Sequence, residues 1–239
     1  MARITVHGRT RFFAVVADGA GSADHAEQGA HLVCTRLHGM LRRWLLRQPA
    51  DATLLPQPAQ VQKWLHHAHT ALVNEAARLG ASPRQLACTV LGVIAGAEGV
   101  TCFQIGDGAI VLCLPAPAVT DDGAGALPGE TAMAAKADQA VGPYQVAIWP
   151  DNGEYANTTF FVTDDDYADH LHVAIFDAGP TAVALLSDGM QRLALNMAAH
   201  SVHEPFFTPF FTRLLAEAAR TGHNPRRVAG NFSRQRPGQ

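Results

Sequence analysis

Residues 12–30 read FFAVVADGAGSADHAEQGA, and this stretch holds the strand, the loop and the helix start on which the fold depends. The apolar, partly β-branched run from Arg11 to Ala17 predicts a buried strand, and the Asp-Gly-Ala-Gly-Ser that follows predicts a loop. Asp18 therefore stands at a strand end. Asp24 and Glu27 have the spacing of a capping box, which predicts that a helix begins there.

Two amphipathic helices are predicted after this strand. Apolar residues recur at helical spacing over residues 24–47 and 58–79, and a proline-rich loop separates the two runs. From Leu86 the pattern becomes β-rich, with strands expected at 86–95, 100–105 and 109–114. Asp107-Gly108 is a strong turn signal, so we expect a hairpin between the last two strands in an antiparallel meander.

The remainder of the chain is less regular. Residues 115–140 are rich in Ala, Gly, Pro and Asp without an apolar period, which predicts a loop. Further elements are expected as strands at 158–163, 173–176 and 181–187 and as a late helix at 206–220. We predict one domain over residues 1–220 and a disordered tail over 221–239.

Composition narrows the classes of function. The chain has 239 residues, 48% of them hydrophobic, and a formal charge of −3 from 18 basic and 21 acidic side chains. This balance gives no field that would gather polyanions, so we expect neither nucleic-acid nor membrane partners. The four cysteines are widely spaced, and no apolar stretch is long enough to span a bilayer, so a reduced, cytoplasmic setting is expected.

Three Asp-Gly pairs stand at predicted strand ends, at Asp18, Asp107 and Asp188. Any one of them is most simply a turn, because Asp-Gly is a common turn sequence. Carboxylates held at several strand ends can also converge on a hard cation, since magnesium and manganese prefer oxygen ligands. The pairs therefore become informative only in their wider context.

That context is four sequence blocks in a fixed order. They are FFAVVADGAGSADHAEQGA, then CTVLGVIAG with CFQIGDGAIVL, then GEYANTTFFVT, then ALLSDGMQ. Together they resemble the successive motifs of the metal-dependent type 2C protein serine/threonine phosphatases, particularly the compact bacterial branch, over residues 12–193. The resemblance implies an α+β fold in which two antiparallel β-sheets pack face to face and are flanked by helices.

The resemblance also implies a chemistry and a site. In this family two manganese or magnesium ions, with a weakly held third, activate a bridging water that attacks phosphoserine or phosphothreonine in proteins. Asp18 resembles the bridging carboxylate and Gly19 the carbonyl ligand, while Asp188 resembles a ligand of the second ion and Asp107 the aspartate near the third. Asp18 and Asp188 would then be catalytic, and the partners would be a phosphoprotein substrate and a linked serine/threonine kinase in signalling.

The sequence departs from the family pattern near both ends. No residue from Met1 to Arg11 is acidic, and no acidic residue follows Glu217. The family's phosphate-holding arginine is not matched by Arg3, Arg9 or Arg11. A truncation or a frame shift would explain both departures, and we expect the family's final strand to be lacking. Two alternatives therefore stay open: a catalytically weakened or dead module that binds a phosphoprotein or kinase, and a phosphatase of small molecules.

Other polar clusters are weaker candidates. His66 and His69 have an i, i+3 spacing that can hold a transition metal, but with His67 they read more simply as a solvated helix face. His25 follows the Asp18 loop and could donate a proton to a leaving group, although a surface position is the simpler interpretation. The pair His170 and His172 and the run of aspartates at 164–166 read as solvated segments.

Overall fold

The structure is a computed structural model that describes residues 1–114, 144–151 and 159–220. The chain divides into two compact units, Met1–Arg192 and Leu193–Gln239. The expectations for the loop at 115–140, the tail at 221–239 and the missing final strand fall outside the described residues. The prediction of one domain over residues 1–220 stays a prediction.

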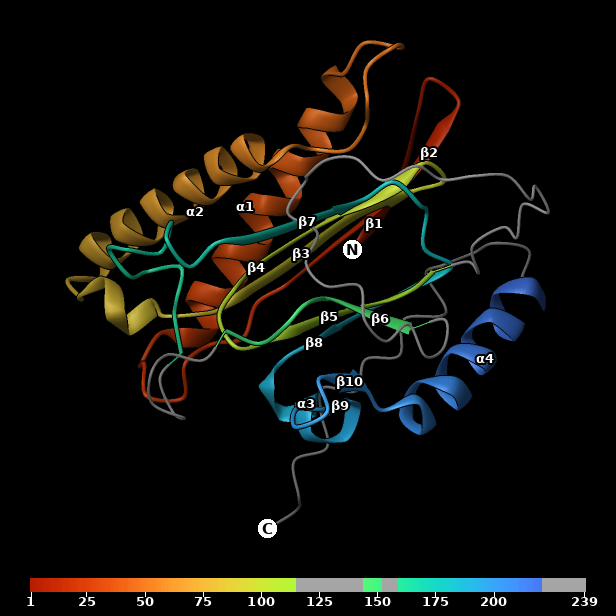
Figure 1. The fold of residues 1–239 in the computed structure, drawn as a ribbon. Coiled ribbons are helices and arrows are strands. Elements are labelled where there is room, and N and C mark those ends of the chain that lie inside the picture. The colour runs from red at the N-terminus through yellow and green to blue at the C-terminus, as the bar shows by residue number, and fades with distance from the viewer. Residues whose placement is uncertain (115–143, 152–158, 221–239) are drawn as a thin grey trace, which may run out of the picture. The chain divides into compact units, whose positions relative to one another are not determined.

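The larger unit contains two antiparallel sheets (Figure 1). The first consists, in spatial order, of β1 (Ala2–Val6), β2 (Arg9–Val16), β3 (Val90–Gly96), β4 (Gly99–Ile105) and β7 (His172–Phe176). The second consists of β6 (Tyr144–Ile148), β5 (Ala109–Cys113) and β8 (Ala182–Leu186). Every pairing within both sheets is antiparallel.

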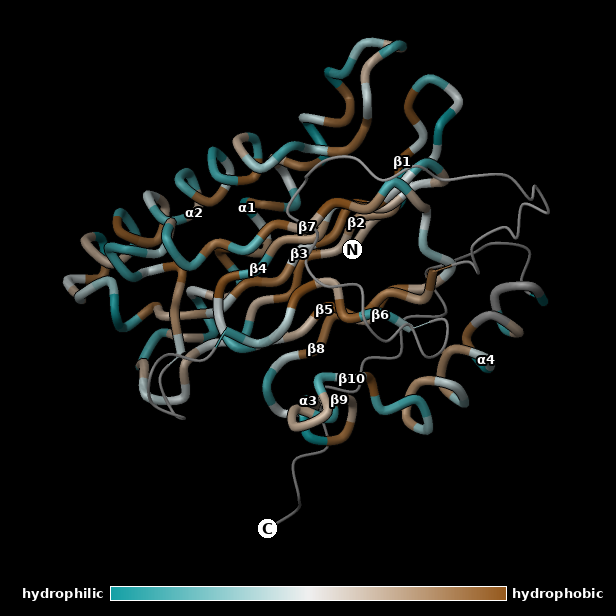
Figure 2. The backbone as a smooth tube through the Cα atoms, in the orientation of Figure 1, coloured by the Kyte–Doolittle hydropathy of each residue, from teal (hydrophilic) through white to brown (hydrophobic). Residues whose placement is uncertain are grey.

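The central strands are buried on both faces, and the period of two along a strand explains why. On β3, Val90 and Ile94 face the long helices, whereas Leu91 and Val93 join the apolar layer between the two sheets. Strands buried on both faces need an almost continuous apolar sequence. Figure 2 shows such a sequence in brown along β3 and β4. The predicted face-to-face packing of two sheets is confirmed.

The helices α1 (Ala26–Arg47) and α2 (Pro58–Leu79) cover the outer face of the first sheet (Figure 1). Their buried stripes, including Leu37, Leu41, Leu65 and Leu72, belong to one apolar cluster with residues of β2, β3 and β4. Gly80 caps the C-terminal end of α2 in the left-handed conformation, which glycine adopts without steric cost. A short 3₁₀ helix, η1 (Pro83–Leu86), then leads into β3.

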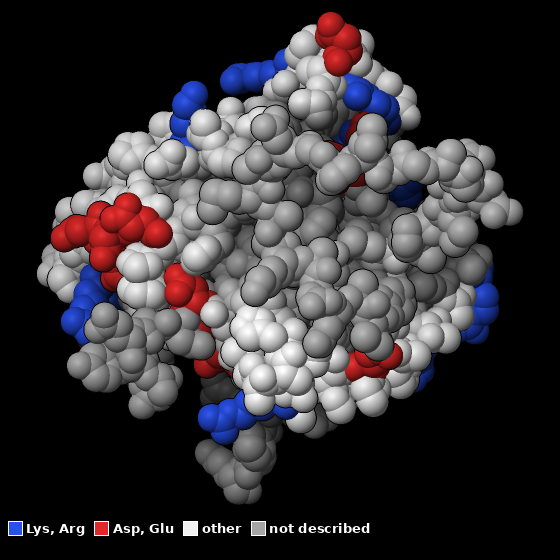
Figure 3. All heavy atoms as spheres, in the orientation of Figure 1, with Lys and Arg blue, Asp and Glu red and all other residues white. Residues whose placement is uncertain are grey.

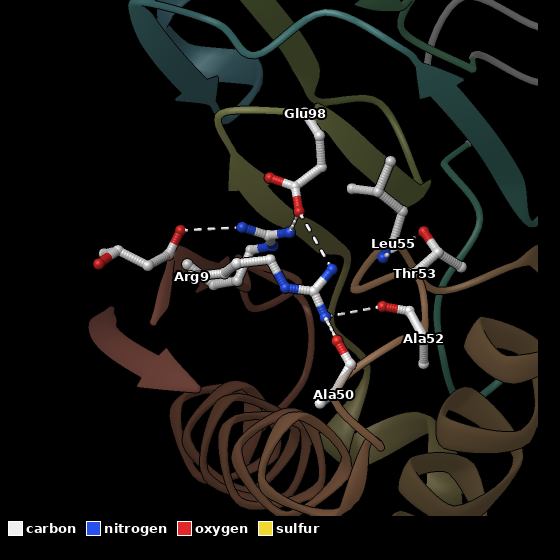
Figure 4. Close-up of polar contacts among 8 residues, drawn as sticks. Arg9, Ala50, Ala52, Thr53, Leu55 and Glu98 are labelled. Atoms are coloured by element: carbon white, nitrogen blue, oxygen red, sulfur yellow. Dashed lines mark hydrogen bonds and ion pairs between the residues drawn. The ribbon is translucent and has the colours of Figure 1, made fainter. Parts of the chain in front are cut away.

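Two arginines fix the start of β2 (Figure 4). Arg9 donates to the carbonyl oxygens of Ala50 and Ala52 at 2.9 and 2.8 Å, which holds the loop between α1 and α2. Arg11 is buried and pairs with Glu98 at the β3–β4 turn. Burial, with the neighbouring Arg9, lowers the pKa of the Arg11 guanidinium, so the Glu98 carboxylate is its necessary counter-charge.

The predicted capping box is wrong. His25 is the N-cap of α1, and no side chain caps this end. The N–H of Asp24 donates instead to the Gln85 side chain at 2.8 Å, and that of His25 donates to the Gln85 carbonyl at 2.8 Å. Tertiary contacts with η1 therefore replace the local cap.

The predicted hairpin at Asp107-Gly108 is also wrong. β4 and β5 lie in different sheets, so the segment Gly106–Gly108 is a crossover between them. Gly106 has a φ of +107°, and a Cβ there would lie 2.6 Å from the Thr89 side chain. The Asp-Gly signal correctly marks a chain reversal, but both edges of β4 are already paired, with β3 and with β7, so β5 continues in the second layer.

The strand predicted at 158–163 is not formed by the described residues of this segment. Thr159 makes a single bridge, and Val162 and Thr163 lie in a turn. The Asp164 carboxylate accepts from the Phe161 N–H at 2.7 Å, and such local side-chain bonds compete with ladder formation. Strands β1 and β6 and the short helix α3 (Asp188–Ala194) were not predicted.

The smaller unit contains a short hairpin and a helix. β9 (Leu195–Asn196) pairs with β10 (Ser201–Val202), and α4 (Glu204–Arg220) follows, close to the predicted late helix. The rings of Phe207 and Phe211 stack at 5.6 Å between centroids, one helical turn apart. No helix among the described residues is long and apolar enough to span a bilayer.

Candidate active site

Three strand ends meet at one edge of the larger unit, and each carries one of the predicted aspartates. β2 ends just before Asp18, and its last residue Val16 pairs with Leu91 near the start of β3. β4 ends at Ile105, which pairs with Val90, so the crossover with Asp107 begins beside the same point. β8 ends at Leu186 opposite Ala109, the first residue of β5, and Asp188 follows.

The loop with Asp18 is tied to the chain before β3. The Asp18 carbonyl accepts from the Thr89 N–H at 2.8 Å, and the Asp18 N–H donates to the Thr89 hydroxyl at 3.2 Å. Gly19 forms a bridge with Cys88. A Cβ at Gly19 would lie 2.8 Å from the Cβ of Ala26, so glycine lets α1 begin directly above the loop.

The Asp107 crossover is held by amides from two elements. The side chain of Gln104 is fully buried and donates to the carbonyls on both sides of Asp107, those of Gly106 and Gly108, at 2.9 and 2.8 Å. Gln191, on α3, donates to the Asp107 carbonyl itself. The Thr159 hydroxyl donates to Oδ2 of the Asp107 carboxylate at 2.7 Å.

Asp188 is the first residue of α3 and is exposed, while Asp18 and Asp107 are half-buried. Burial raises the pKa of the Asp18 carboxyl above its ordinary 3.8. Repulsion from Asp188 raises this pKa further, a hydrogen bond from the Ser187 side chain opposes the rise, and repulsion from Asp107 adds a smaller increase. The structure thus brings the three aspartates within electrostatic reach of one another.

This donor set fits a hard divalent cation in chemistry and in charge. Burial and repulsion between the three carboxylates disfavour the charge on Asp18. A bound cation would offset this unfavourable energy. Among the described residues, no three His, Cys, Asp or Glu side chains lie close enough together to hold one ion. Magnesium, however, keeps several waters and is commonly bound through one or two carboxylates, so a pair such as Asp18 and Asp188 is a sufficient protein contribution.

The cysteines are poor candidates for a nucleophile. Burial raises the pKa of both Cys88 and Cys102 to about 12, and it also raises that of Cys34. A thiol must ionise to attack phosphorus, so these side chains are unreactive near neutral pH. Cys88 lies beside the Asp18 loop but serves it through its backbone.

The weaker sequence candidates lie elsewhere or have local partners. His66 and His67 are exposed, as expected of a solvated face. His69 is half-buried, and its Nδ1 donates to the Val162 carbonyl oxygen at 2.8 Å. His172 contacts the Asp151 carboxylate at 2.9 Å. His25 is half-buried at the N-cap of α1, near the Asp18 loop, and its role as a proton donor stays a prediction.

The N-terminal arginines are not at this edge. Arg9 and Arg11 lie at the start of β2 and Asp18 follows its end, so Arg11 and Asp18 are separated by about 23 Å of extended chain. Both arginines already contact Glu98. They do not supply the phosphate-holding group that the sequence left unassigned.

Sequence reasoning missed the polar residues that support the aspartates, namely Ser187, Thr89, Gln104, Thr159 and Gln191. Gln104 had a usable signal, because it is a lone amide inside the apolar run GVTCFQI of β4. A buried polar side chain in such a run must find partners, and the nearest are the backbone carbonyls of the turn that follows. The other residues gave no signal in a single sequence.

Comparison with known proteins identifies the family of the chain. The profile of the family described as Protein phosphatase 2C matches residues 2–226. The chain is also 33% identical over 201 residues to Serine/threonine-protein phosphatase 3 of Escherichia coli (strain K12), an alignment that covers 84% of this chain and 68% of that protein.

Similar solved structures are more distant in sequence. One is PppA, described as a key regulatory component of T6SS in Pseudomonas aeruginosa, with 19% identity, a TM-score of 0.45 and coverage of 83% of this chain and 74% of that chain. Another is the serine-threonine phosphatase 2C from Toxoplasma gondii, with 13% identity, a TM-score of 0.45 and coverage of 91% and 76%. On the profile match and the E. coli relative, this chain belongs to the protein phosphatase 2C family.

Proposed function

We propose that this protein is a phosphatase that hydrolyses phosphoserine and phosphothreonine in proteins with the help of manganese or magnesium. The observation that carries the proposal is the gathering of Asp18, Asp107 and Asp188 at adjoining strand ends of two sheets. Family membership and the name of the E. coli relative support the same reaction. The high pKa of the buried cysteines speaks against a thiol nucleophile.

In this proposal Asp18 and Asp188 would hold the divalent ions, with the Gly19 carbonyl as a further oxygen ligand and Asp107 nearer a weakly held third ion. Bound divalent ions would lower the pKa of a water and neutralise charge on the phosphoryl group. The protein's own contribution is to hold several carboxylates close together at fixed strand ends. Ser187 assists by hydrogen bonding to the Asp18 carboxylate.

The charge and cysteine patterns support the wider setting. Lys and Arg side chains lie in separate groups on the face drawn in Figure 3 and form no continuous basic field among the residues described there. The four cysteines, all of which are described, are unpaired, which supports a reducing compartment such as the cytoplasm. We propose a phosphoprotein substrate linked to a serine/threonine kinase in signalling, and neither nucleic acid nor membrane as a partner.

Activity is expected to be weak and to require much metal. Among the residues that the structure describes, three carboxylates gather at this site. Fewer carboxylates offset less of the repulsion between two cations and less of the cost of removing their waters. Half-maximal turnover is therefore expected only at millimolar manganese.

The test is turnover of p-nitrophenyl phosphate and of phosphothreonine peptides across a manganese titration, with Asp18→Asn as the variant. Asp24→Asn is a matched control, because it removes the same charge from an exposed residue of the same loop. We expect metal-dependent turnover that Asp18→Asn abolishes and Asp24→Asn leaves intact. Turnover that needs no metal, or that survives in Asp18→Asn, would contradict the mechanism. No turnover at any metal concentration would favour a phosphoprotein-binding module.

A further inference from the structure

The backbone around Asp107 is fixed on every side that the structure describes. Gln104 holds the carbonyls of the residues before and after it, and Gln191 holds its own carbonyl. A Cβ at Gly106 would also lie 3.0 Å from the Phe160 carbonyl oxygen, so the segment that contains Thr159 and Phe160 packs closely against the crossover. The freedom left to Asp107 is therefore rotation of its side chain.

One hydroxyl restricts that rotation. Thr159 donates to Oδ2 of Asp107 at 2.7 Å, a short bond of the kind that a charged acceptor makes. The Thr159 segment is itself anchored, because the Val162 N–H donates to the Cys88 carbonyl at 2.9 Å, beside the Asp18 loop. A fixed donor on one carboxylate oxygen sets the plane of the carboxylate, and with it the direction in which Oδ1 points.

We propose that Thr159 is a positioning residue that sets the orientation of the Asp107 carboxylate at the candidate metal site. The inference rests on the proposed function, since orientation matters only if Asp107 takes part in cation binding. Partners that orient metal ligands typically contribute about 10- to 100-fold to metal affinity. Nothing in the sequence distinguishes Thr159 from the threonine before it, and the contact with Asp107 alone assigns this role.

The test compares Thr159→Val, which removes the donor at nearly constant shape, with Thr159→Ser, which keeps it. Thr181→Val is a matched control, because Thr181 makes a similar 3.0 Å bond to the Cys113 carbonyl. Cys113 pairs with Ala182 at the opposite end of β5 from Asp107. Manganese binding is measured by calorimetry, together with the manganese dependence of turnover.

We expect Thr159→Val to weaken the more weakly bound manganese by about 10- to 100-fold while the turnover rate at saturating metal changes little. Thr159→Ser should restore affinity, and Thr181→Val should bind as the unaltered protein does. Unchanged affinity in Thr159→Val, or equal losses in the Val and Ser variants, would overturn the proposal.

A double-mutant cycle separates positioning from general damage. In an Asp107→Asn background, Thr159→Val should add no further loss of manganese affinity, and an additive loss would refute the role. Failure of the proposed function looks different: the unaltered protein would bind no manganese, or Asp18→Asn would bind it equally well. In that case the positioning role of Thr159 is refuted together with the proposed function. A negative result for Thr159→Val alone refutes only the positioning role.

Discussion

Substitution of Gly29 by alanine tests how α1 holds the loop that carries Asp18. A Cβ at Gly29 would lie 2.1 Å from the carbonyl oxygen of Leu86, a backbone atom of η1 that cannot rotate away. Alanine gains about 1 kcal/mol over glycine in helix propensity, but overpacking typically costs about 1 to 3 kcal/mol. Contact with a backbone atom favours the upper end, so the net loss should be about 1 to 2 kcal/mol.

For a chain of this size that loss corresponds to a Tm lower by about 2 to 8 °C. Activity should fall as well, because the Ala20 N–H of the Asp18 loop donates at 2.9 Å to the carbonyl of Ala87, the residue after η1. Gly39→Ala is the control in the same helix. Its Cβ would lie 3.4 Å from the end of the flexible Arg43 side chain, so it should stabilise by about 0.5 to 1 kcal/mol.

Both variants are measured by thermal and urea denaturation followed by circular dichroism. Opposite signs for Gly29→Ala and Gly39→Ala are the expected result. Equal stabilisation by the two substitutions would refute the close contact between α1 and η1, and with it this account of how the Asp18 loop is held.

Two further predictions concern charge. Asp18→Asn should raise the Tm in EDTA at pH 7, because it removes a charge that burial and repulsion from Asp188 and Asp107 disfavour in the folded state. Because the pKa of Asp18 is raised in the folded state, the unfolded chain loses this proton first as the pH rises above 3.8. Near pH 3 both states keep the proton, so the stabilisation by Asp18→Asn should vanish there. Stabilisation that persists at about pH 3 would contradict the prediction. Glu98→Gln should lower the free energy of unfolding by about 1 to 3 kcal/mol, because it leaves the buried Arg11 guanidinium without a counter-charge. The loss is moderate because the Glu98 side chain is partly exposed. No loss would show that Arg11 finds another acceptor.

The sequence predicted the long elements and the architecture well, because their periodicity comes from burial. The helices at 26–47 and 58–79 agree with predictions of 24–47 and 58–79. The order of strand, two helices and strands correctly favoured two packed antiparallel sheets. These features depend on many apolar residues at once, so single exceptions do not change the result.

Local turn signals were less reliable, because tertiary contacts override them. Asp107-Gly108 reverses the chain, but β3 and β7 already occupy both edges of β4, and this decides that the next strand enters a second sheet. Asp24 and Glu27 had the correct spacing for a cap, yet Gln85 supplies the contact from 61 residues away in the chain. The segment at 158–163 has strand composition, but the Asp164 side chain bonds its backbone into a turn.

The candidate site was partly predictable for the same reason. The aspartates could be named because each follows a strand, but the hydroxyls and amides that fix them come from separate elements. Thr159 lies 52 residues from Asp107, and Gln191 lies 84 residues from it. No spacing rule relates residues that meet only through the packing of two sheets.

Anomalous diffraction from crystals of the protein soaked in manganese tests the central claim most directly, because it locates ions without reference to activity. The account predicts manganese within about 2.0 to 2.6 Å of carboxylate oxygens of Asp18 and Asp188, with a weaker peak near Asp107. No peak at this edge at millimolar manganese, or ions bound only elsewhere on the chain, would contradict the account.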